Sequence, residues 1–184
     1  AEEVCLITKL AHKHEVSLFV LGGGANLLVR DKGIRGAVVF TGRLHRMERK
    51  GNLLTVASGV PTAAAARKAL EYGLSGMEFA SGIPGSIGGA AYMNAGAYGG
   101  EMAKIIVSAT TCDAKGDIIV HSIKDMGYGY RHSPFMQNGE VILDITLSLK
   151  PGNQKDIEAL MKDLNQRRAT KQPLEKRSAG STFK

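Results

Sequence analysis

Residues 81–100 read SGIPGSIGGAAYMNAGAYGG, and this stretch decides the fold prediction because it holds seven glycines and no charged residue. Glycine has no Cβ, so its main chain can approach a ligand closely and adopt positive φ angles. Successive main-chain N–H groups in such a segment can form a concave surface that suits phosphate. A second glycine run, LGGGAN at 21–26, comes earlier in the chain. Two such segments in one small chain predict a large phosphate-bearing ligand.

Length and composition limit the class of protein. With 184 residues, 43% of them hydrophobic, the chain can form one or two domains with a buried core. No apolar stretch approaches the ~20 residues of a membrane span, and no secretory signal is recognisable. Cys5 and Cys112 lack the spacing of a disulfide framework, which favours a reducing, cytoplasmic compartment. No metal site is predicted, because His12 and His14 have no ligand partner at a suitable spacing.

The formal net charge of +7 is compatible with nucleic-acid binding. However, the basic residues are spread along the chain, with small groups at 43–50 and 167–171. Aromatic side chains, which stack on bases, make up only 5% of the residues, and tryptophan is absent. An anionic small ligand explains the charge at least as well, so we predict neither a nucleic-acid nor a membrane partner.

The spacing of apolar residues predicts helices over 1–14 and 155–169, and Pro61 and Gly73 bracket another. Short apolar runs predict strands at 18–21, 27–29, 37–40 and 141–149, and hairpins over 47–57 and 105–121. Helices and strands do not alternate strictly, so the predicted class is α+β.

The first glycine run differs from the common nucleotide motifs. In residues 22–27, Leu27 stands where the third glycine of a Rossmann G-x-G-x-x-G motif belongs, and a strand pattern follows it. No G-x-x-x-x-G-K-[ST] segment occurs either. The sequence therefore predicts neither a Rossmann nor a P-loop site.

Five segments together resemble the UDP-N-acetylenolpyruvoylglucosamine reductase family: LGGGANLLV, SGIPGSIGGAAYMNAGAYGGE, YGYRHSPF, TKQP and SAGSTFK. The resemblance covers essentially the whole chain. It implies the FAD-binding fold of the vanillyl-alcohol-oxidase or PCMH type, in which two α+β subdomains hold the flavin. Residues 1–40 would be the remainder of the first subdomain and 41–150 the second. Residues 151–184 would connect to a substrate-binding domain. We therefore expect a fragment that lacks N-terminal strands and most of that last domain.

The resemblance also implies the reaction. Members of the family use NADPH and non-covalently bound FAD to reduce UDP-N-acetylglucosamine enolpyruvate to UDP-N-acetylmuramate, a step of bacterial peptidoglycan synthesis in the cytoplasm. A family glutamate that shares the stabilisation of the enolate lies in the C-terminal domain, so we expect this chain to be impaired in turnover.

By the same resemblance, Arg131 would hold the substrate carboxylate while negative charge develops on it. Guanidinium is always charged and grips a carboxylate with two donors. Ser181 would donate the proton, and Tyr130 and Lys171 would bind the UDP-sugar substrate. The glycine segments would contact FAD, although alanine replaces the family's serine at position 25. The expected FAD-binding residues are Gly22, Gly23, Gly24, Ala25, Asn26, Leu27, Ser81, Gly82, Ile83, Pro84, Gly85, Ser86, Gly88, Gly89, Asn94, Gly96 and Ala97.

Two alternatives remain open at this point. One is a flavin-dependent oxidase of the same fold. Such enzymes often bind the flavin covalently through a histidine or cysteine near the glycine loop, and neither residue type lies beside 22–26. The other is a non-catalytic module that binds nucleic acid or another anion.

Overall fold

A five-stranded antiparallel sheet with helices on both faces organises residues 1–172, which the computed structural model describes. The helices are α1 (Glu2–Lys13), α2 (Thr62–Glu71), α3 (Ile87–Tyr92), α4 (Phe135–Asn138) and α5 (Gln154–Lys171). The strands are β1 (Leu18–Leu21), β2 (Ala37–Phe40), β3 (Met47–Lys50), β4 (Leu53–Ala57), β5 (Leu74–Ser75), β6 (Gly96–Ala97), β7 (Gly100–Glu101), β8 (Ile106–Cys112), β9 (Ile118–Ser122), β10 (Val141–Ser148) and β11 (Lys150–Pro151).

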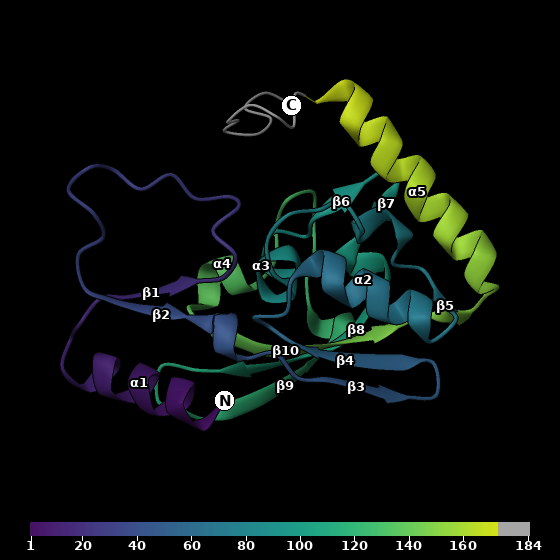
Figure 1. Ribbon diagram of the computed structural model, residues 1–184. Coiled ribbons are helices and arrows are strands. Elements are labelled where there is room, and N and C mark those ends of the chain that lie inside the picture. The colour runs from purple at the N-terminus through teal and green to yellow at the C-terminus, as the bar shows by residue number, and fades with distance from the viewer. Residues whose placement is uncertain (173–184) are drawn as a thin grey trace.

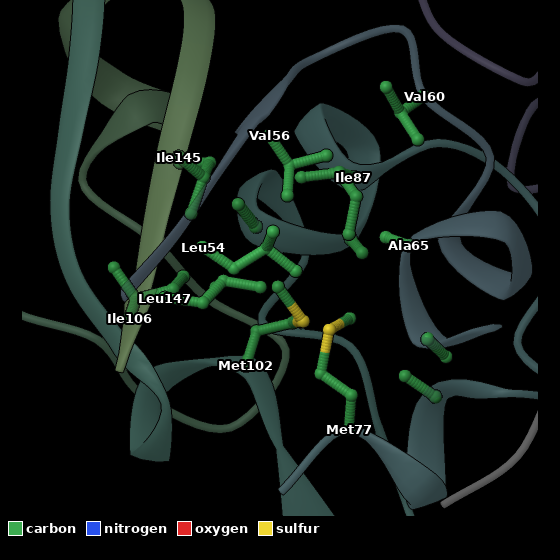
Figure 2. Close-up of a cluster of buried hydrophobic side chains, with 14 of the residues drawn as sticks. Leu54, Val56, Val60, Ala65, Met77, Ile87, Met102, Ile106, Ile145 and Leu147 are labelled. Atoms are coloured by element: carbon green, nitrogen blue, oxygen red, sulfur yellow. The ribbon is translucent and has the colours of Figure 1, made fainter. Parts of the chain in front are cut away.

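The main hydrophobic core lies between this sheet and helices α2 and α3. The strands follow the order β3-β4-β10-β8-β9, and Figure 1 shows α2 and α3 on one side of them. In Figure 2, Leu54 and Val56 of β4 lie with Ile145 and Leu147 of β10 in one cluster that also includes Ile87 of α3. Alternate residues of a strand point to the same face, which explains why these positions share one core.

Strand β10 carries apolar residues on both faces and contains a bulge. Its pairing with β8 shifts register between Ile142 and Asp144, and an extra residue in a strand changes which face the following side chains occupy. The bulge explains why Ile142 and Ile145, three residues apart, both belong to the main core, while Val141 and Leu143 belong to a second cluster. In this second cluster, α1 and β2 pack against the sheet through Val4, Cys5, Val39 and Cys112.

Strands β1 and β2 form a separate two-stranded parallel sheet, with Leu18 opposite Ala37 and Leu21 opposite Phe40. The segment between them, 22–36, contains no regular secondary structure. Figure 1 shows it as the long purple-to-blue excursion at the side of the molecule. Because β1 ends at Leu21, the first glycine run begins directly where this small sheet stops.

Most of the predicted elements are confirmed. The predicted hairpins become β3–β4 and β8–β9, and the segment between Pro61 and Gly73 becomes α2. The mixed order of helices and strands agrees with the α+β class. The proposed boundary at residue 40 stays a prediction. None of the helices in residues 1–172 is long and apolar enough to cross a membrane.

The predicted strand at 27–29 is wrong. These residues have no regular structure, and Leu28 is 91% exposed. Apolar residues form a strand only when a neighbouring strand satisfies the main-chain groups and one face is buried. Within the described residues, no strand pairs with this segment. Strand 37–40 instead pairs in parallel with 18–21.

Candidate functional site

One open cavity of about 360 Å³ lies between the two glycine-rich segments. This volume falls at the lower end of the range typical of small-molecule sites, ~300–1,000 Å³. The first segment contributes 22–27 and the second contributes 83–86, together with residues of α3 and β6. The cavity therefore joins the two segments that the sequence singles out.

The first segment, 22–27, presents main-chain donors without internal partners. The N–H groups of Gly23, Gly24, Ala25 and Asn26 donate to no acceptor within residues 1–172, and these four residues are exposed. Main-chain N–H groups are strong donors that need an acceptor wherever water is excluded. A series of such donors at a cavity can bind an anion.

The second segment is fixed from behind by α2. Thr62 donates to the Gly85 carbonyl through its main-chain N at 3.0 Å and its hydroxyl at 3.2 Å. Gly85 has φ +97°, a conformation that favours glycine. Ser86 caps α3 by accepting from Gly89 N at 3.4 Å. The N–H groups of Gly85 and Ser86 have no acceptor in the described part of the chain.

The two segments approach so closely that side chains would not fit between them. A Cβ on Gly23 would lie 2.6 Å from Gly85 Cα, and one on Gly22 would lie 2.5 Å from Ser86 Oγ. At Gly23 the segments therefore meet main chain to main chain, whereas at Gly22 the main chain faces the Ser86 side chain. Glycines 22, 23 and 85 serve the packing of the segments as well as the surface of the cavity.

Arg131 lies at the cavity and is held by main-chain carbonyls. Its guanidinium donates to Asn94 O at 3.2 Å and to Gly96 O at 3.1 Å. Its Cζ also lies 5.1 Å from the centre of the Tyr130 ring. A guanidinium has five N–H donors, so those not directed at carbonyls can bind an anion.

Asn94 connects the second glycine segment to the Arg131 loop. Its side chain donates to Gly129 O at 2.8 Å and accepts from Ala103 N at 2.9 Å. It is only 2% exposed and has φ +43°. Because both ends of the amide are used within the protein, Asn94 positions the loop and does not line the cavity.

Most of the predicted site residues come together, but several lie elsewhere. Gly88 packs against Ser58, and Ser81 donates to the carbonyl of Glu78 and to Asn165. Lys171 is exposed near the end of α5. Ser181 lies outside the described residues. The predicted residues that line the cavity are Gly22, Gly23, Gly24, Ala25, Asn26, Leu27, Ile83, Pro84, Gly85, Ser86, Gly89, Gly96, Ala97 and Arg131, whereas Ser81, Gly82, Gly88, Asn94, Tyr130 and Lys171 do not.

Sequence reasoning missed several residues of the cavity wall. The apolar part of the wall comes from β1 and α3, and a second cationic side chain comes from α5. The β1 residues could have been found because that strand leads directly into the first glycine segment. The missed residues are Phe19, Val20, Leu21, Ala90, Tyr92, Met93, Ala95 and Arg168.

Two titratable groups outside the cavity are shifted by burial. Burial, followed by the neighbouring Cys5 and Asp113, raises the pKa of the Cys112 thiol to about 12. Burial also raises the pKa of Tyr128, whose hydroxyl has no hydrogen-bond partner within residues 1–172. Both groups are therefore neutral at physiological pH. Residues 1–172 contain no group of three or more metal-ligating side chains.

Comparisons with known proteins agree with this arrangement. Residues 1–122 match the family model described as an FAD binding domain. The chain is 46% identical over 182 residues to the UDP-N-acetylenolpyruvoylglucosamine reductase of Clostridium kluyveri, covering 99% of this chain and 60% of that protein. It has the same identity and coverage with the reductase of Streptococcus thermophilus. The chain thus spans about 60% of the length of the curated relatives it matches, and the resemblance predicted from its motifs is confirmed.

Solved structures show the same fold. The crystal structure of UDP-N-acetylenolpyruvylglucosamine reductase from Thermus caldophilus matches with a TM-score of 0.82 and 34% identity, over 95% of this chain and 64% of that chain. The 6-hydroxy-D-nicotine oxidase of Arthrobacter nicotinovorans matches with a TM-score of 0.60 and 18% identity, over 82% of this chain and 34% of that chain. At this identity, the oxidase supports the FAD-binding fold alone.

Proposed function

The chain belongs to the FAD binding domain family, and on that premise we propose that it binds FAD without a covalent bond in the cavity between its two glycine segments. One observation carries this proposal. Unpaired N–H groups of Gly23–Asn26 and of Gly85–Ser86 border the same cavity. A pyrophosphate carries several acceptor oxygens and suits such a set of donors.

The rest of the cavity wall suits the remainder of a dinucleotide. Apolar side chains from β1 and α3, such as Phe19, Leu21 and Ala90, line it beside the glycine segments. Ring systems bind against apolar walls of this kind, while a few polar groups fix their orientation. The residues present therefore fit FAD.

We further propose that this chain forms the FAD-binding part of a UDP-N-acetylenolpyruvoylglucosamine reductase. The curated relatives carry that name and are 46% identical. The substrate would be UDP-N-acetylglucosamine enolpyruvate and the product UDP-N-acetylmuramate. When bound, FAD supplies hydride-transfer chemistry, with NADPH as the reductant implied by the resemblance.

The role proposed for Arg131 is to hold the substrate carboxylate. Reduction of the enolpyruvyl double bond places negative charge on this group, and a fixed guanidinium stabilises such charge more than water does. The bonds from Arg131 to Asn94 O and Gly96 O keep the guanidinium at the cavity. The proton that completes the reaction is assigned to Ser181 by the resemblance, and Tyr130 and Lys171 stay proposed contacts of the UDP-sugar.

The test is titration of the purified protein with FAD, followed by absorbance and by quenching of flavin fluorescence. We expect saturable binding of one FAD per chain and release of the flavin on denaturation. Addition of NADPH should then bleach the flavin band. Failure to bind FAD at any concentration would refute the proposal. Flavin that stays attached to denatured protein would instead support the covalent chemistry found in some oxidases.

A further inference from the structure

Helix α5 brings a second arginine to the cavity. Arg168 lines the cavity together with Arg131 and both glycine segments. It is half-buried, whereas its neighbour Arg167 is exposed. Among the described residues of α5, only Ile157 and Leu164 are buried apolar anchors. Few apolar side chains of α5 are therefore buried, and most of the helix surface is polar.

The second glycine segment provides the place where Arg168 fits. A Cβ on Gly82 would lie 3.2 Å from Arg168 Cδ and 2.6 Å from Asn165 Oδ1. Ser81 also donates to Asn165 Oδ1 at 3.4 Å. Glycine at position 82 therefore lets α5 lie directly on the segment, with the stem of Arg168 against its main chain.

The charge of Arg168 is unbalanced, unlike that of its neighbours. Arg167 pairs with Asp163 at 2.7 Å, and Lys162 pairs with Glu158 at 2.8 Å. Within residues 1–172, the Arg168 side chain has neither a hydrogen bond nor an ion pair. The guanidinium donors of Arg168 are therefore available to an anion bound in the cavity.

We propose that Arg168 binds a phosphate group of the ligand in this cavity, together with the N–H groups of Gly85 and Ser86. The guanidinium fork matches two phosphate oxygens, and such charge-assisted bonds are stronger than neutral ones. Arg168 is thus a binding residue for the cofactor's pyrophosphate, separate from the carboxylate role proposed for Arg131. This inference rests on the proposed function, because it takes FAD as the ligand.

The experiment compares Arg168→Gln with Arg167→Gln, two changes that remove the same charge from adjacent positions of one helix. FAD affinity is measured by fluorescence quenching at low ionic strength. We expect Arg168→Gln to weaken binding at least tenfold, as for loss of a hydrogen bond to a charged group. Arg167→Gln should bind within twofold of wild type. Phosphorus NMR at saturating FAD should show shifted pyrophosphate resonances only in Arg168→Gln.

The outcomes separate this inference from the proposed function. If the wild-type protein binds no FAD, the proposed function fails. If it binds FAD but Arg168→Gln binds equally well, the inference alone is overturned. Equal losses in both variants, or lower affinity with unmoved phosphorus resonances, would overturn it as well. Should Arg168→Gln not fold, Arg168→Lys provides the same test, since lysine keeps the charge but cannot form the fork, and we expect an intermediate loss.

Discussion

The main chains of Gly23 and Gly85 touch, although one follows β1 and the other precedes α3. A Cβ on Gly23 would lie 2.6 Å from Gly85 Cα and 2.9 Å from Gly85 C. Main-chain atoms cannot rotate away as the end of a flexible side chain can. The separation of the two segments, and with it the shape of the cavity, is therefore set by the absence of a side chain at position 23.

We predict that Gly23→Ala moves the segments apart and weakens FAD binding at least tenfold. Forcing an extra carbon into a packed contact also destabilises a protein by ~1–3 kcal/mol. Gly127→Ala is the matched control, because a Cβ at that position meets nothing within 4 Å. Calorimetric FAD titration and urea unfolding of both variants provide the measurement. Equal affinities for Gly23→Ala and Gly127→Ala would show that the contact does not shape the site.

Loss of the Asn94 side chain should loosen the Arg131 loop. Asn94→Ala leaves Ala103 N without its partner and removes one of the two hydrogen bonds that Gly129 O accepts, the other coming from His132 N. An unsatisfied buried donor costs ~1–3 kcal/mol. We expect the free energy of unfolding to fall by about 1–3 kcal/mol in urea titrations. Asn138→Ala, which removes one exposed hydrogen bond to Glu140 N, should cost less. A smaller effect at position 94 than at position 138 would contradict this role.

Arg131→Lys should separate catalysis from cofactor binding. Lysine keeps the charge but cannot grip a carboxylate with two donors, and loss of a stabilising donor lowers turnover by roughly 100-fold or more. FAD affinity should stay within twofold of wild type. The measurement is NADPH oxidation that depends on UDP-N-acetylglucosamine enolpyruvate, alongside flavin titration. Unchanged turnover would remove Arg131 from the proposed carboxylate site.

The raised pKa of Cys112 predicts a loss of stability at alkaline pH. An unfolded thiol ionises near pH ~8.5, whereas in the folded protein its pKa is about 12. Between these values the unfolded state loses the proton first. The contribution of this thiol to stability is therefore complete below about pH 8.5 and decreases as the pH rises. In urea titrations, the stability difference between wild type and Cys112→Ala should narrow from pH 8 to pH 10. A constant difference would contradict the assignment.

Alanine variants at the adjacent residues Leu53 and Leu54 test which face of β4 packs into the core. Leu54 is fully buried, whereas Leu53 is 38% exposed. Leu54→Ala should cost ~2–5 kcal/mol of unfolding free energy, as expected for large-to-small changes in a packed core. Leu53→Ala should cost less than about 1 kcal/mol. Thermal and urea unfolding of the two variants gives the comparison. Similar losses of unfolding free energy would contradict the assignment of Leu54, and not Leu53, to the core face of β4.

Local patterns were sufficient for much of the fold. The turn residues Lys50-Gly51-Asn52 predicted the β3–β4 hairpin, and Pro61 and Gly73 bracketed α2. Residues 27–29 show where such patterns fail. Their apolar character matches a strand, but no other segment within the described residues pairs with them. Pairing is a tertiary property that no single run of residues encodes.

The candidate site was also predictable from the sequence only in part. The two glycine-rich segments predicted both walls of the cavity, because a close approach of main chains requires glycine and glycine is visible in the sequence. No sequence pattern predicted that Arg168 lies at the cavity. It reaches the cavity only because α5 packs on Gly82, and nothing in the local sequence separates it from Arg167. Asn94 likewise fits a ligand-contact pattern, while its hydrogen bonds show that it holds a loop.

The hydrogen bonds from Arg131 to two main-chain carbonyls have a consequence for the entropy of ligand binding. A free arginine side chain samples many rotamers, and ordering it costs up to ~2 kcal/mol of conformational entropy. In this protein Asn94 O and Gly96 O already restrict the guanidinium. Ordering has thus taken place during folding, so the carboxylate that we propose for this site would meet a preorganised partner and lose less affinity to immobilisation.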